Sequence, residues 1–371
     1  MARRPLWSAL FGAAAISGLL LGQPLAARSA QEQPPVADVL ERYGHGQFDA
    51  AIADLTRDRK LGELEPRFRR EAGRWLTESG EWTRGKRLAI VSALALELVA
   101  SSFDRDRGEY NAVRPLIEWA CGLLRQVPPS EFERLFHLAS IGLLQGVRDE
   151  EMLAGARVYS DQSRHEHVLH GGGRFPQESR FKLAWVTTRL ETQFIASWPL
   201  SPGHLLQADS GRVRAEPAEA RTQFQETLAT LGRLVGDPRV GYEARLRRGV
   251  LRFVMGAPAD ALPDLRDAAG SGDPFIEYLS HVMQGLVLER TGRLADAIEH
   301  YQSAMRVVPA TAASLALASA LFREGRGSEA AQLVSTWAST PRPEDPWRLY
   351  GLRDYRLFPG FRADMRRMIH P

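Results

Sequence analysis

A glycine followed five residues later by an alanine recurs toward the C-terminal end of the 371-residue chain. The pairs are Gly256 with Ala261, Gly292 with Ala297, and Gly325 with Ala330. Successive glycines lie 36 and 33 residues apart. Self-similarity at such a period is typical of stacked supersecondary units, each of which needs its neighbours to cover its apolar face. This spacing therefore predicts an array of repeated units.

One unit can be followed residue by residue in GLVLERTGRLADAIEHYQSAMRVVP, residues 285–309. It predicts a helix, a tight turn at Gly292 and a second helix that ends at a proline. The short side chains of Gly285 and Ala297 let two antiparallel helices approach closely. Tyr301 fills the space beside them, so the unit is a helical hairpin.

This pattern resembles the tetratricopeptide repeat, whose hairpin positions are filled here by Gly285, Gly292, Ala297, Tyr301, Ala304 and Pro309. The resemblance is clear over residues 242–345, although Trp337 replaces the late alanine of the last unit and Asp273 replaces the closing proline of the first. It implies an all-α fold, a right-handed superhelical array of antiparallel helical hairpins. It also implies a protein-binding role.

The N-terminal half carries an echo of the same spacing. Gly46 precedes Ala51 by five residues in YGHGQFDAAIADL. Further on, apolar residues recur at helical spacing, and residues 86–102, which contain Glu97, are apolar nearly all round after Lys86 and Arg87. That stretch is too short for a membrane span and predicts a buried helix. We therefore expect residues 31–200 to form a divergent helical-repeat region.

Residues 1–30 have the three parts of a secretory signal peptide: two arginines at Arg3 and Arg4, an apolar run, and small residues up to a cleavage point after Ala27 or Ser29. An uncleaved segment that tethers the chain to a membrane is the alternative. The chain has a formal net charge of +3, but a mature chain without the arginines of this segment is close to neutral. We therefore expect a periplasmic or secreted protein and no nucleic-acid partner.

Two other segments interrupt or follow the repeats. Residues 201–216 are polar and rich in glycine, proline and serine, which predicts a linker or long loop before the tetratricopeptide-like repeats at 217–345. Residues 346–371 lie outside the repeat register and predict a cap over the last hairpin. Their aromatic residues offer a second interpretation as a glycan-binding patch: Trp347, Tyr350, Tyr355, Phe358 and Phe361.

The chain lacks the common catalytic, phosphate-binding and dinucleotide-binding motifs. Its one histidine cluster, His165, His167 and His170, does not have the His-Glu-x-x-His spacing of a metalloprotease helix. A single cysteine, Cys121, excludes an internal disulfide. We expect no catalytic residue, bound metal or cofactor. An envelope metal-dependent hydrolase that uses the His165 region is the alternative.

The resemblance places a partner-binding groove on the first helices of the repeats. Its residues would be Leu246, Val250, Phe253, Val282, Leu286, Glu289, Arg290, Leu315, Phe322 and Arg323. The lysines and asparagines with which some family members hold a terminal carboxylate are missing, and the mixed apolar and charged lining favours a peptide segment or an amphipathic helix. Several of these residues would instead be core if the next repeat buries them. The leading hypothesis is an exported, non-catalytic scaffold that binds a protein or peptide in the cell envelope.

Overall fold

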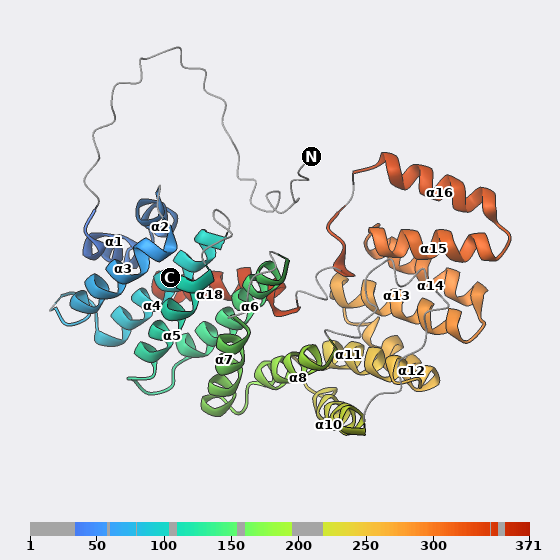
Figure 1. Ribbon diagram of the computed structural model, residues 1–371, viewed down its shortest axis with the longest axis horizontal. Coiled ribbons are helices and arrows are strands. Elements are labelled where there is room, and N and C mark those ends of the chain that lie inside the picture. The colour runs from blue at the N-terminus through green and yellow to red at the C-terminus, as the bar shows by residue number, and fades with distance from the viewer. Residues whose placement is uncertain are drawn as a thin grey trace, which may run out of the picture. The chain divides into compact units, whose positions relative to one another are not determined.

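The computed structural model describes residues 34–57, 60–78, 80–103, 110–153, 160–194, 218–341, 343–347 and 353–371. Every regular element in those ranges is a helix, which confirms the all-α prediction (Figure 1). The predicted signal peptide at 1–30 and the predicted linker at 201–216 lie outside the described residues.

The helices of the N-terminal half are α1 (Val36–Gly44), α2 (Phe48–Thr56), α3 (Leu61–Trp75), α4 (Arg84–Phe103), α5 (Tyr110–Leu124), α6 (Glu131–Leu153), α7 (Ser160–Arg174) and α8 (Ser179–Phe194). Those of the C-terminal half are α10 (Ala218–Leu234), α11 (Gly241–Val254), α12 (Pro258–Ala268), α13 (Pro274–Arg290), α14 (Leu294–Val307), α15 (Thr311–Arg323), α16 (Gly327–Ser339), the 3-10 helix η2 (Arg353–Leu357) and α18 (Phe358–Ile369).

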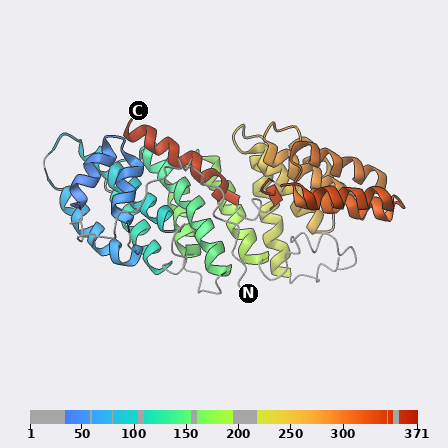
Figure 2. The ribbon, with the colours of Figure 1, turned by 90° about the horizontal axis from the view of Figure 1, so that it is seen from above.

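The chain divides into two compact units. The first comprises Met1–Phe136, Glu150–Ser163 and Gly360–Pro371, and the second comprises His137–Asp149 and Arg164–Pro359. Helices that follow one another pack as pairs within each unit, among them α1 with α2, α4 with α5, α11 with α12, α13 with α14, and α15 with α16. Both ribbon views show the hairpins from α11 to α16 lying side by side (Figures 1 and 2).

The three C-terminal hairpins turn in the same way. Gly256, Gly292 and Gly325 all have positive φ, at 83°, 79° and 84°, a conformation that glycine adopts without a steric penalty. After each glycine the next amide donates to a carbonyl five residues earlier, as Arg293 does to Leu288 at 2.9 Å. This is the Schellman arrangement, which satisfies carbonyls left over at a helix end.

The N-terminal hairpin of α1 and α2 has the same turn. Gly46 has a φ of 83°, and the amide of Gln47 donates to the Arg42 carbonyl at 3.0 Å. Ala51, five residues after the glycine, is fully buried. The echo recognised in the sequence is therefore a structural equivalent of the C-terminal hairpins.

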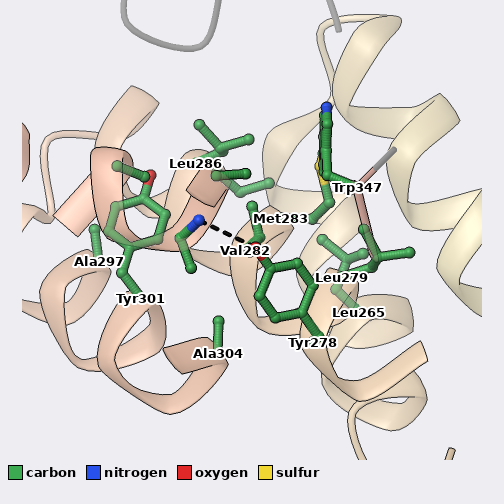
Figure 3. Close-up of a cluster of buried hydrophobic side chains, with 14 of the residues drawn as sticks. Leu265, Tyr278, Leu279, Val282, Met283, Leu286, Ala297, Tyr301, Ala304 and Trp347 are labelled. Carbon is green, nitrogen blue, oxygen red and sulfur yellow. Dashed lines mark hydrogen bonds between the residues drawn. The ribbon is translucent and has the colours of Figure 1, made fainter. Parts of the chain in front are cut away.

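Close approach of α13 and α14 depends on glycine. A Cβ atom added at Gly285 would lie 2.3 Å from Cε1 of Tyr301, which leaves no room for any larger residue. Gly249 holds the same place in the preceding hairpin, where a Cβ would lie 2.8 Å from Cγ of Leu265. Ala297 and Tyr301 are fully buried in the resulting core (Figure 3).

Asp345 ties the last hairpin to the one before it. Its Oδ1 accepts a hydrogen bond from the Tyr278 hydroxyl at 3.1 Å, and its Oδ2 accepts from the amide of Ala312 at 2.6 Å. The Tyr278 oxygen in turn accepts from the amide of Ala313 at 3.1 Å. Trp347, two residues beyond Asp345, packs into the same core (Figure 3).

The helix α4 is buried along most of its length, as its composition predicts. It accordingly serves as the centre of the first unit, in contact with α1, α2, α3 and α5. Within the described residues, no helix combines the length and the apolar character that crossing a membrane would need. The carboxylate of Glu97 lies within this apolar helix, only 2% exposed.

The residues predicted as a C-terminal cap are divided between the two units. Trp347 covers part of the core of the last hairpins, but residues 360–371 belong to the first unit. There α18 contacts Glu97 of α4 and Asp49 of α2, and Figure 2 shows the red helix beside the blue N-terminal helices. The tail therefore leaves most of α16 uncovered by the described residues, with Ala330 as its one buried residue.

Candidate partner-binding surface

Four of the ten predicted groove residues belong to the core. Leu246, Val250, Val282 and Leu286 are all less than a tenth exposed. They lie on α11 and α13, and these two first helices pack directly against each other. Neighbouring repeats therefore use these positions for their own contact, which is the second interpretation that the sequence left open for them.

The remaining predicted residues lie near the C-terminal ends of the first helices. Phe322 is 71% exposed at the end of α15, the largest exposed fraction among the large apolar side chains that the structure describes. Arg323 and Arg290 are exposed at the last positions of α15 and α13, while Phe253 is half-buried near the end of α11. We call Phe253, Glu289, Arg290, Phe322 and Arg323 the Phe322 surface. Leu315, also predicted, is half-buried about two turns before Phe322, nearer the start of α15.

Contacts between repeats hold the Phe322 surface in place. Arg323 of α15 forms an ion pair with Glu289 of α13. The Tyr301 hydroxyl donates to the same carboxylate at 2.6 Å. The guanidinium of Arg290 lies 5.9 Å from the ring centre of Phe253, within reach of a cation–π interaction. The arginines also complement the negative ends of their helices, so the surface combines apolar and basic groups on a fixed backbone.

The predicted histidine cluster does not converge. His167 is buried on α7, where its Nδ1 lies 2.9 Å from Nδ1 of His137. His165 and His170 are exposed. In the part of the chain that the structure describes, neither belongs to a group of three side chains placed to hold a metal ion. Among the described residues, His165 and His170 thus add no ligand to a metal site shared with His167.

The tail aromatic residues do not form one exposed patch. Trp347 and Phe358 are buried, and Tyr355 and Phe361 are half-buried. Tyr350 lies outside the described residues. Stacking on a sugar needs an accessible ring face, so this placement does not favour the glycan-binding alternative.

Sequence reasoning missed two carboxylates that arginines of the tail contact. Glu243 of α11 meets Nη2 of Arg356 at 3.0 Å, and Arg180 and Arg247 at 2.6 and 2.7 Å. Burial alone would raise the pKa of Glu243, but the three guanidiniums outweigh it and hold the pKa well below its ordinary value. The other carboxylate is Glu97. The only sequence signal for it is an acid within an apolar helix, and its two arginine partners lie more than 260 residues away.

Comparison with known families agrees with the hairpin geometry. A family model described as tetratricopeptide repeat matches residues 282–346, from within α13 to the segment that follows α16. This part of the chain therefore carries a tetratricopeptide repeat, a unit that is typically non-catalytic and binds proteins. No curated protein matches the chain. The hairpin of α11 and α12 precedes the matched residues, yet it has the same turn and the same glycine contact.

Proposed function

We propose that the chain is a non-catalytic scaffold, exported to the cell envelope, that binds a segment of a protein partner on the Phe322 surface. The observation that carries this proposal is the 71% exposure of Phe322 beside the repeat turns. Isolated exposed apolar residues are common on protein surfaces. Here, however, Phe322 lies with a second phenylalanine and two arginines at equivalent ends of successive first helices.

The chemistry of the surface defines the class of partner. Apolar contact with Phe322 and Phe253 would bury most of the exposed ring area. Arg290 and Arg323 would favour carboxylates beside that apolar stripe, while Glu289 takes up part of the positive charge through its ion pair with Arg323. A peptide or amphipathic helix with an apolar stripe and an acidic flank fits this arrangement.

Site-specific crosslinking tests the surface. A photoreactive phenylalanine analogue at position 322 should crosslink an envelope protein, whereas the same analogue at Val334 should not. Val334 is a suitable control because it is also exposed, at 41%, but lies on the second helix of the same hairpin. Phe322→Ala should then weaken the binding of the purified partner at least tenfold, which corresponds to about 1.4 kcal/mol.

An unchanged affinity for the Phe322→Ala chain would contradict the proposed surface. The side chain makes little contact with the core, so this substitution should leave the fold intact, and circular dichroism provides the check. Export is supported by the sequence pattern of residues 1–30 and has a separate test. The intact mass of the chain recovered from the envelope should correspond to cleavage after Ala27 or Ser29, and a full-length mass in the cytosol would refute it.

A further inference from the structure

The last helix seats on the first unit through an amphipathic face. Met365 and Ile369 of α18 are buried, and Arg362 and Arg366 lie on the same side because residues three and four apart share a helix face. The side chain of Arg367, by contrast, is 71% exposed and pairs with Asp364 of its own helix. One face of α18, with its two arginines and its two buried apolar residues, therefore packs against the helices of the first unit.

The receiving helices present a carboxylate to both arginines. Nε of Arg366 donates to Oε1 of Glu97 at 2.7 Å, and Nε of Arg362 lies 2.6 Å from Oε2. Arg366 also donates to Asp49 at 2.9 Å. The Tyr43 hydroxyl, from α1, donates to Glu97 at 3.5 Å. Burial and the neighbouring Glu97 charge raise the pKa of Tyr43 well above its ordinary value, which keeps this hydroxyl protonated.

The far end of α18 is held as well. Nζ of Lys86 donates to the carbonyl oxygens of Ile369 and Met368. The last carbonyl groups of a helix have no amide donor within the helix itself, so this contact satisfies them. The ring of His370 lies close to the turn at Gly46, where a Cβ atom would be 3.0 Å from its Cγ. We call Tyr43, Asp49, Lys86 and Glu97 the Glu97 surface. It recognises two arginines and a helix end.

A buried ion pair contributes little to the free energy of unfolding. Desolvation offsets most of the attraction between the charges, and an apolar pair of the same size often stabilises as much or more. What such a pair adds is selectivity, because a helix without the two arginines would leave Glu97 buried with an uncompensated charge. The Glu97 surface therefore discriminates among helices by charge and spacing, as a docking site for a helix requires.

We propose that the Glu97 surface is a docking site for a partner helix that carries two arginines four residues apart, and that α18 occupies it as an autoinhibitory ligand from within the chain. This partner differs in charge from the acidic one expected at the Phe322 surface. The protein would then bind two kinds of segment, and release of α18 would control one of them.

Fluorescence anisotropy with a labelled peptide of residues 358–371 tests the docking site on the full chain. Wild-type protein should bind the peptide weakly, because α18 occupies the surface. The Arg362→Ala, Arg366→Ala chain should bind the wild-type peptide at least tenfold more tightly. Adding Glu97→Gln to this variant should abolish the gain, and a peptide with both arginines replaced should not bind. Arg367→Ala, on the exposed side of α18, is the matched control and should behave as wild type.

The proposal is overturned if the folded double variant binds the peptide no better than wild type, or if Glu97→Gln leaves its binding unchanged. Should the double variant not fold, the single Arg366→Ala chain, which keeps Arg362 on Glu97, takes its place in the same titration. Hydrogen exchange gives an independent reading. A saturating amount of peptide should speed exchange in α18 of the single variant at least tenfold, and unchanged exchange would show that α18 is a fixed part of the fold.

Discussion

Replacing Gly285 with alanine tests the close contact between α13 and α14. The added Cβ would lie 2.3 Å from Cε1 and 2.7 Å from Cδ1 and Cζ of Tyr301. An ordinary contact between such atoms needs about 3.5 Å or more, so the ring or the helix must move by roughly 1 Å. The ring has little freedom to do so, because it is fully buried and its hydroxyl is bonded to Glu289.

Two effects of opposite sign determine how much Gly285→Ala changes the free energy of unfolding. Overpacking of a close-packed core typically costs about 1–3 kcal/mol, and a rigid aromatic neighbour places this site near the upper end. Alanine is favoured over glycine inside a helix by about 1 kcal/mol, which offsets part of that cost. We therefore expect Gly285→Ala to destabilise the hairpin by about 2 kcal/mol.

Gly73 of α3 supplies the matched control, since a Cβ added there would meet no atom within 4 Å. Gly73→Ala should stabilise its helix by about 0.5–1 kcal/mol, the intrinsic preference alone. Hydrogen exchange measured on peptides from α13 and α14 separates local opening from global unfolding. Equal stability of the two alanine variants, or unchanged exchange in α14 of the Gly285→Ala chain, would refute the packing argument.

The sequence predicts the hairpins because their determinants are local. The turn at Gly292 needs a residue with positive φ, and the contact beside Tyr301 needs the absent side chain of Gly285. Both requirements leave a fixed spacing in the chain. The same argument recovers the N-terminal turn at Gly46, although the residues around it have diverged.

The local sequence could not predict which of the groove residues are buried, or which helices the C-terminal tail contacts. Whether Leu246 and Leu286 face a partner or a neighbouring helix depends on how α11 packs on α13, and both arrangements place the same apolar residues at the same helical positions. The pairing of Glu97 with Arg366 joins residues 269 positions apart. No periodicity links such residues, and only the buried acid within an apolar helix signals that a distant cation is needed.

Two further predictions concern charged groups in the second unit. Burial lowers the pKa of His281 and of His300, whose Nδ1 atoms lie 3.3 Å apart, so below about pH 6.5 the unfolded chain binds more protons than the folded one. The melting temperature should therefore fall as the pH is lowered from about 7 toward 5, and His300→Gln should flatten this dependence; identical slopes would contradict it. Glu243→Gln leaves three arginines without their shared carboxylate, and urea titration should show a loss of about 3 kcal/mol. A loss below about 1 kcal/mol would show that the arginines find other partners.

Asp345 provides the last test, because it caps the N-terminus of α15, a role usually filled by the residue just before a helix. The residue before α15, Ala310, has no side chain that can cap the helix. Asp345 instead accepts from the amide of Ala312 at 2.6 Å, from a position beyond the following helix. It also accepts from the buried hydroxyl of Tyr278 at 3.1 Å.

Asp345→Ala removes both interactions at once. Loss of a helix cap costs about 1 kcal/mol, and a buried hydroxyl left without its acceptor costs about 1–3 kcal/mol. We expect a total destabilisation of about 2–3 kcal/mol and faster hydrogen exchange in the first turn of α15. Asp345→Asn keeps one carbonyl oxygen that can accept, so it should lose less than the alanine variant. If the two variants are equally stable, or if exchange at Ala312 is unchanged in the alanine variant, then Trp347 and the surrounding apolar contacts hold the last hairpin without help from this carboxylate.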